Sequence, residues 1–235
     1  MSETTKREFT PRPALAYFAI IFALASPMIQ AAIRPVLEGN FPFPVDRFLS
    51  IWVFWIAVAV AYVISVKIEG IPIETFGIKK NTRSLRYRLI ELIVAIILGL
   101  LVSIVVIGFS TVVRDWLDAP LENTFDPERI IPFWVILPAW LTAAFAEEAL
   151  FRSYPIERLT MLTGNRWLAA GISILAFIVL HLFGWDWIHV MTVVLPSAIL
   201  LTGLYLWRGS LWFVVVVHGI VNLPILFLPL IAPFL

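Results

Sequence analysis

Long apolar runs constrain this chain more than any other feature. Of its 235 residues, 61% are hydrophobic and only 14% are charged, whereas soluble domains average about 25% charged residues. A helix needs about 20 apolar residues to cross a bilayer. We therefore predict an all-α, polytopic membrane protein, with residues 1–235 forming a single transmembrane domain of seven or eight helices around an intramembrane cavity. The expected spans are 14–33, 48–66, 89–113, 131–161, 167–183, 187–206 and 211–221, and the last can continue to 235.

Lysine and arginine are distributed unevenly between the segments that connect these runs. The N-terminus and the second, fourth and sixth connections hold 13 of the 17, and the other connections hold 4. Because cytoplasmic connections are enriched in these residues, we predict that the N-terminus and the basic segment 67–88 lie in the cytoplasm. The net charge of +1 gives no indication of nucleic-acid binding, and the absence of cysteine excludes thiolate metal sites and nucleophiles.

Three ionisable residues, Glu147, Glu148 and Arg152, fall inside the predicted span 131–161. A charge at the centre of a bilayer costs roughly 2.5–3.5 kcal/mol by insertion assays, and such residues usually mark a functional site. Glu148 and Arg152 are four residues apart in the order that favours an ion pair on one helix face. Because neighbouring helical residues point in different directions, we expect Glu147 to find its partner on another helix.

Only three residues are histidines, and two of them, His181 and His218, lie within apolar runs. Glu147 and His181 each lie 17 residues from Gly164, so an antiparallel helical hairpin would place them at similar depth. His218 lies nine residues past the next turn on that side, a depth mismatch of roughly 12 Å at 1.5 Å per residue. Asn222 is one helical turn beyond His218, so both side chains can point to one place.

These four polar residues can together hydrolyse an amide without a covalent intermediate. A carboxylate and an imidazole can activate water as a general base. A second imidazole and an amide can donate hydrogen bonds to a developing oxyanion. The third histidine, His189, follows Trp185 and Trp187, which are typical of a membrane interface.

Three motifs occur in order on successive predicted helices: Glu147-Glu148…Arg152, Phe177…His181 and His218…Asn222. They resemble the CPBP family, which includes type II CAAX prenyl endopeptidases and bacterial Abi-type membrane proteins. The resemblance covers residues 130–225, which we take as the catalytic core. It implies an intramembrane glutamic endopeptidase in a prokaryotic plasma membrane, without a cofactor.

The resemblance also implies a role for each motif residue. Glu147 with His181 would activate water, His218 and Asn222 would form the oxyanion site, and Glu148, Arg152 and Phe177 would support them. In the eukaryotic branch the cavity opens to the cytoplasm, which agrees with placing segment 152–166 inside. The expected partners are membrane lipids and a peptide or protein substrate, and the family's prenyl specificity is not carried over to this chain.

Alternatives remain open at this point. Glu147, His181 and His218 are candidate zinc ligands with water as the fourth, although the sequence contains no His-Glu-x-x-His helix. A non-proteolytic immunity or scaffold protein would use the same fold without chemistry. A transporter is a further alternative, since buried Glu and His residues also relay protons.

Overall fold

The computed structural model describes residues 12–79, 84–119, 131–224 and 226–227, and these residues form helices without strands. The α-helices are α1 (Pro13–Leu24), α2 (Ser26–Asn40), α3 (Val45–Ser50), α4 (Trp52–Tyr62), α5 (Leu85–Trp116), α6 (Phe133–Leu141), α7 (Tyr154–Thr163), α8 (Arg166–His181), α9 (Trp187–His189), α10 (Leu195–Arg208) and α11 (Leu211–Val221). Between them lie the π-helical segments η1 (Val63–Ile68), η4 (Thr142–Glu147), η5 (Ala149–Ser153) and η6 (Val190–Val194), and the 3₁₀ turn η2 (Ile73–Phe76).

The predicted all-α, polytopic membrane fold is confirmed, but the count of seven or eight spans is not. Four continuous helices are long and apolar enough to cross a membrane, and the pair α1–α2 raises the number to five if it acts as one bent span. Helices α8 and α11 are apolar but have only 16 and 11 residues, short of the roughly 20 that a span requires. The proposed eighth span falls largely on residues outside those described. The four continuous spans are Val45–Ile68, Leu85–Trp116, Phe133–Thr163 and Trp187–Arg208.

The first apolar run is bent by 57° between α1 and α2. Pro27 has no N–H, so the carbonyl of Ala23 cannot receive its usual helical hydrogen bond. The hydroxyl of Ser26 donates to that carbonyl instead, at 2.8 Å. The bend therefore has a local cause, and the buried Ala23 carbonyl keeps a hydrogen-bond donor.

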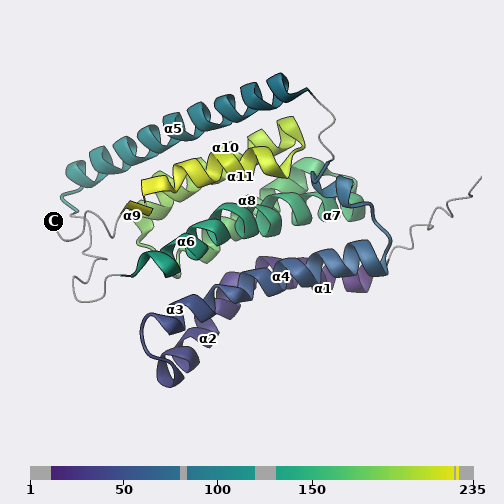
Figure 1. Ribbon diagram of the computed structural model, residues 1–235, viewed down its shortest axis with the longest axis horizontal. Coiled ribbons are helices and arrows are strands. Elements are labelled where there is room, and N and C mark those ends of the chain that lie inside the picture. Colours follow the sequence, from purple (N-terminus) through teal and green to yellow (C-terminus); the bar gives the residue numbers. More distant parts are fainter. Residues whose placement is uncertain (1–11, 80–83, 120–130, 225, 228–235) are drawn as a thin grey trace, which may run out of the picture.

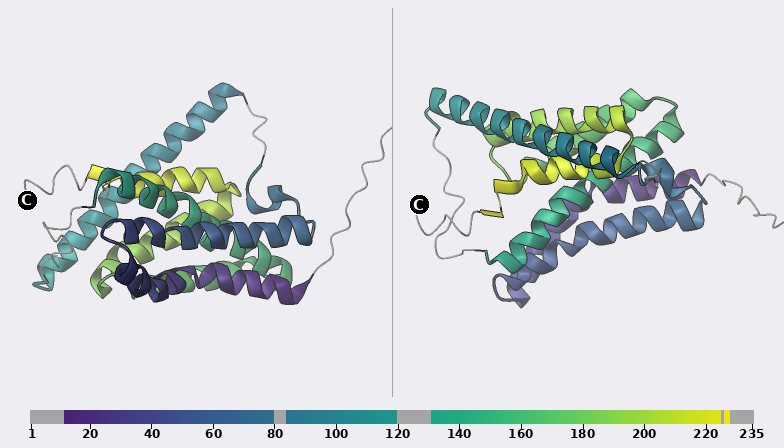
Figure 2. Two further views of the ribbon diagram at one scale, coloured as in Figure 1. Left: turned by 60° about the horizontal axis from the view of Figure 1, so that its bottom comes forward. Right: turned by 45° about the horizontal axis from the view of Figure 1, so that its top comes forward.

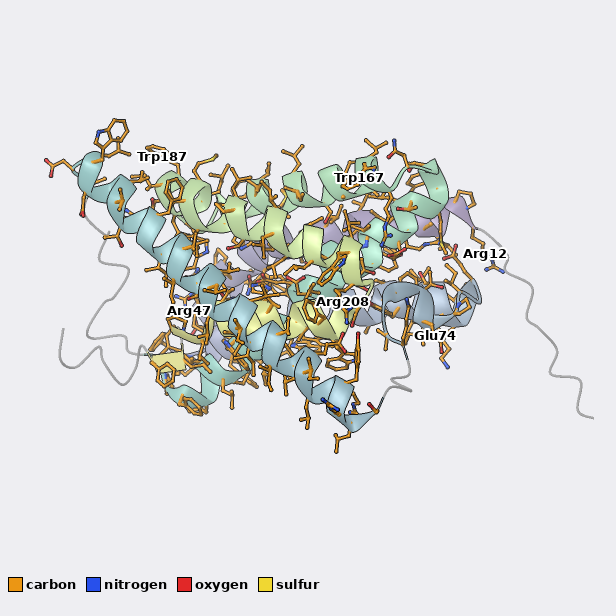
Figure 3. The ribbon with its side chains drawn as sticks, turned by 90° about the horizontal axis from the view of Figure 1, so that it is seen from above. Arg12, Arg47, Glu74, Trp167, Trp187 and Arg208 are labelled. Carbon is orange, nitrogen blue, oxygen red and sulfur yellow. The ribbon has the colours of Figure 1, made fainter. Side chains whose placement is uncertain are left out.

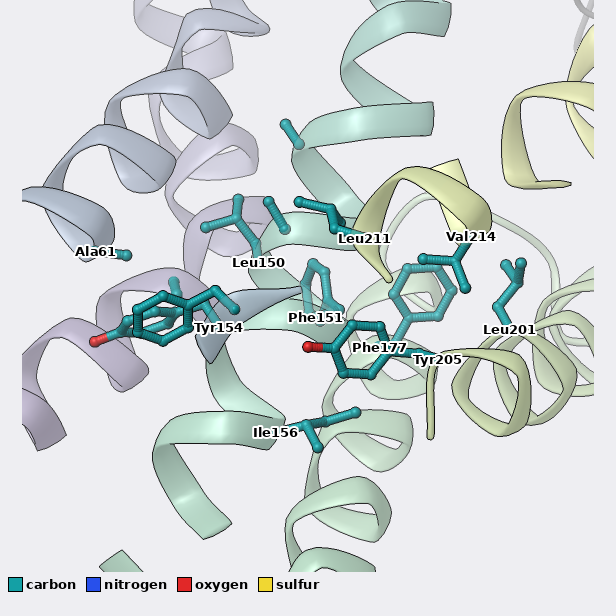
Figure 4. Close-up of a cluster of buried hydrophobic side chains, with 14 of the residues drawn as sticks. Ala61, Leu150, Phe151, Tyr154, Ile156, Phe177, Leu201, Tyr205, Leu211 and Val214 are labelled. Atoms are coloured by element: carbon teal, nitrogen blue, oxygen red, sulfur yellow. The ribbon is translucent and has the colours of Figure 1, made fainter. Parts of the chain in front are cut away.

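Small and aromatic side chains fill the centre of the bundle. Ala16, Ala19 and Ala23 on α1 are fully buried, as are Ala57 and Ala61 on α4, which allows these helices to approach closely. A cluster of larger buried side chains lies between α7, α8, α10 and α11 (Figure 4). Large apolar side chains on the outer helix faces are exposed, as expected for a surface in contact with lipid.

Helix α5 crosses the outside of the bundle obliquely (Figure 2). It lies against α11 at Gly99, where an added Cβ would come within 2.6 Å of the Ile220 Cβ atom and 2.9 Å of the Val217 carbonyl oxygen. Only glycine permits this close approach. The contact holds α5 beside α11, where the last turns of α5 form one wall of the cavity described below.

The helices run along the long axis of the molecule, so the bundle has two distinct ends (Figure 1). We call one the basic end: it holds Arg12, segment 67–79, the start of α5 and the turns α7–α8 and α10–α11. The opposite end holds the turn between α2 and α3, the last residues of α5, α8 and α11, and α9. In Figure 3, Arg12 and Glu74 lie at the basic end, and Arg47 and Trp187 lie at the opposite end.

Candidate active site

The two glutamates lie where two π-helical segments meet, and such segments are frequent at functional sites. Glu147 ends η4, and Glu148 separates it from η5. Pro155, just after η5, lacks the N–H that would bond the Phe151 carbonyl in an α-helix. The hydroxyl of Ser173 on α8 donates to that carbonyl instead. The proline thus accounts for the irregular turn and for one link between this helix and α8.

A cavity of about 500 Å³ lies beside these turns. Its walls come from η4, α5, α8, η6, α10 and the end of α11. All four predicted catalytic residues line it: Glu147, His181, His218 and Asn222. The structure therefore brings together side chains from three segments that are separated by up to 75 residues in sequence.

Glu148 is fully buried and is not one of the residues that line the cavity. Its Oε1 accepts a hydrogen bond from Arg152 Nη1 at 2.8 Å, so the ion pair indicated by their spacing is present. The same oxygen lies 2.7 Å from Nδ1 of His218. A carboxylate that is paired with arginine accepts hydrogen bonds, so His218 donates through Nδ1 and directs Nε2 toward the cavity. The sequence did not predict this link.

His181 is oriented by its own helix. Its Nδ1 lies 2.7 Å from the backbone carbonyl oxygen of Phe177, which can only accept a hydrogen bond. Nδ1 therefore carries a proton, and Nε2 of the neutral ring has a free lone pair. The Phe177 ring packs against the imidazole, with 4.2 Å between centroids, and the Arg152 guanidinium lies 4.1 Å from the centroid of the same ring. Phe177 thus supports both motifs.

Glu147 is half-buried, and its carboxylate has no hydrogen bond to any other residue in the described part of the chain. It shares the cavity with His181 without a direct hydrogen bond between them. The expected depth mismatch of His218 is absent, because His218 contacts Glu148. Figure 1 shows the reason: the α7–α8 turn projects beyond the α10–α11 turn. The Glu147 carboxylate lines the cavity without a hydrogen bond to another described residue, so it is suited to bind water there.

The cavity also contains residues that were not predicted for it. His189 lines it and stacks on Trp185 with 4.4 Å between ring centroids, although the sequence suggested only an interface position. Arg114 forms an ion pair with Asp186 at 2.6 Å, and Asp186 accepts from the His189 backbone N–H at 3.0 Å. Burial opposes ionisation of Asp186, but these donors lower the pKa of its carboxyl. Asp186 is the N-cap of α9, and its side chain accepts from the backbone N–H three residues later. An aspartate at the start of a predicted helix is the sequence signal that could have indicated this contact.

The residues do not form a ready metal site. Among the described residues, no three His, Asp or Glu side chains are grouped closely enough to hold a metal ion. Nδ1 of each cavity-lining motif histidine is already engaged, by Phe177 for His181 and by Glu148 for His218. The zinc alternative would therefore require Glu147 and both Nε2 atoms to move together.

Comparison with known proteins supports the motif assignment. Residues 129–224 match the family model of the type II CAAX prenyl endopeptidase Rce1-like proteins. A search of curated proteins found no match, and a search of solved structures found none either. The resemblance noted in the three motifs is thereby confirmed. The chain is a polytopic α-helical membrane protein whose residues 129–224 are similar to the Rce1-like type II CAAX prenyl endopeptidases.

Proposed function

We propose that this protein is an intramembrane glutamic endopeptidase that hydrolyses a peptide bond in a membrane-associated peptide or protein. The observation that carries the proposal is one cavity lined by His181, His218, Asn222 and Glu147, whose carboxylate has no hydrogen bond to another described residue. The family domain supports a membrane endopeptidase in general. The roles below are our assignment.

Glu147 and His181 act on the attacking water. The Glu147 carboxylate removes one proton from the water, while the lone pair on His181 Nε2 accepts a hydrogen bond from it and orients it. The water oxygen then attacks the carbonyl carbon of the substrate. The proton held by Glu147 passes to the leaving nitrogen when the C–N bond breaks, so the carboxylate is regenerated. General acid–base catalysis of this kind contributes about 10²–10⁴-fold.

His218 and Asn222 stabilise the oxyanion. Asn222 donates through its amide. His218 already donates Nδ1–H to Glu148, so it can donate to the oxyanion only if Nε2 also carries a proton. The Glu148 carboxylate accepts from Nδ1 and so holds the ring in place, with Nε2 toward the cavity. Glu148 is therefore a positioning residue for His218, and Arg152 in turn fixes Glu148.

Comparative mapping of peptide termini in membranes tests this function. Cells carrying wild type should produce new termini that are missing from cells carrying Glu147→Gln at equal protein level. A zinc-dependent version of the protease would show stoichiometric zinc in purified protein, and activity lost to chelator and restored by zinc. An immunity or scaffold role predicts instead that Glu147→Gln leaves both the termini and the cellular phenotype unchanged.

A further inference from the structure

The position of the cavity along the bundle determines the side of the membrane from which it can be reached. The lining residues on α5 belong to its last turns, from Val106 to Asp115, and Ala119 lines the cavity just beyond the helix. His181 is the last residue of α8, and Asn222 directly follows α11. All of these lie toward the end opposite the basic end. The cavity therefore extends from the depth of Glu147 to that opposite end.

The mouth of the cavity lies at the level of an interface. Arg114, Asp115 and Trp185 line it, and Asp115 and Trp185 are exposed. Trp116 is 82% exposed and Trp187 is 59% exposed beside it. Tryptophans of this kind gather where a bilayer meets water, so the mouth opens at the membrane surface rather than within the lipid.

The basic residues lie at the other end. The structure refines the sequence count, because Arg152 is buried within its helix beside the cavity and does not flank a span. Among the described residues, eight lysines and arginines then remain at the basic end, against three at the end with the mouth. An excess of this size assigns the basic end to the cytoplasm.

We infer that the cavity opens on the extracytoplasmic side of the membrane, so that the substrate is a peptide segment presented on that side. This differs from the cytoplasmic opening that the family resemblance implied. The statement about the opening rests on geometry and charge alone, whereas the statement about the substrate rests on the proposed function.

Cysteine labelling tests the opening directly, because the chain has no cysteine of its own. Ala119→Cys places a thiol at the mouth, and Glu74→Cys places one on an exposed position at the basic end. A membrane-impermeant maleimide should label the Ala119 variant in intact cells and the Glu74 variant only after permeabilisation. The reverse pattern, or labelling of both variants in intact cells, would overturn the inference. Thr111→Cys, deeper on the same wall, gives a second reading if Ala119→Cys does not accumulate.

The statement about the substrate is tested by a separate measurement. Termini that depend on Glu147 should map to extracytoplasmic segments of membrane peptides, and termini confined to cytoplasmic segments would contradict it. Labelling does not require catalysis, so the same pattern is expected in a Glu147→Gln background. Failure to find Glu147-dependent termini would count against the peptidase, while the maleimide result would still decide the direction of opening.

Discussion

Two glutamate–arginine pairs are buried in this molecule, and they differ in what surrounds them. Glu69 and Arg158 come from segments 89 residues apart, and Arg158 Nη2 reaches both carboxylate oxygens, at 2.8 and 2.7 Å. The backbone N–H of Arg12 adds a third hydrogen bond. This pair joins the start of α1, the end of η1 and α7 at the basic end, away from the cavity, and its carboxylate is fully hydrogen-bonded.

Glu148 and Arg152 form the second pair, on a single helix beside the cavity. One oxygen of Glu148 serves both Arg152 and His218, and Oε2 has no hydrogen-bond partner among the described residues. A buried carboxylate oxygen without a hydrogen-bond donor costs free energy of folding and calls for an explanation. We therefore take the Glu69 pair as a support of the fold, whereas in the proposed mechanism the Glu148 pair gives up some stability to hold His218 in position.

Among single substitutions in the two pairs, the largest effect on cleavage is expected from Glu148→Gln. A glutamine side chain no longer forms the ion pair with Arg152 and does not hold the His218 ring as the carboxylate does. One oxyanion donor is then lost, which costs about 10²–10³-fold in cleavage rate. The measurement is the initial rate per folded molecule in detergent, with Glu69→Gln as the matched control. If Glu148→Gln cleaved as fast as Glu69→Gln, the Glu148 pair would have no more part in cleavage than the Glu69 pair.

Glu69→Gln should act on stability instead. Breaking one partner of a buried ion pair costs about 3–5 kcal/mol, because Arg158 is left as an uncompensated charge. The free energy of unfolding, measured by denaturant titration in mixed micelles, should fall accordingly. The molecules that remain folded should cleave at the wild-type rate, and a proportionate loss of rate would show that this pair also serves the site.

Replacing both members of each pair sharpens the comparison. Glu69→Leu with Arg158→Met should be neutral or stabilising by about 1–4 kcal/mol, as for other buried pairs replaced by apolar residues, and should stay active. Glu148→Leu with Arg152→Met should fold but not cleave, because His218 loses its partner. Cleavage by that second double variant would contradict the role of Glu148.

The smallest effect concerns α5, which lies against the helix that carries His218. Gly99→Ala forces a Cβ into Ile220 and should destabilise by about 1–3 kcal/mol through overpacking. Gly108→Ala, on the same helix with nothing within 4 Å of the added Cβ, is the control and should unfold at or above the wild-type temperature. Equal melting temperatures for the two variants would show that α5 does not depend on the close contact at Gly99.

Much of the site was predictable, since local spacing determines the Glu148–Arg152 pair and the proximity of His218 to Asn222. The link between Glu148 and His218 was not, because the sequence does not report how far each helical hairpin projects. The Glu69–Arg158 pair was missed for a related reason: Glu69 was expected in a connection, and the sequence does not report which helix such a connection contacts. The span count was not confirmed, since an apolar run does not reveal a bend such as the one at Pro27 or helices as short as α8 and α11.

The most direct test of the central claim separates the two adjacent glutamates. Glu147→Gln should melt within a few degrees of wild type, because the Glu147 carboxylate has no hydrogen bond to a described residue, yet it should not cleave detectably. Thermal unfolding and cleavage are measured on the same purified sample. Retained cleavage by Glu147→Gln would contradict the account, because water would then be activated by another group.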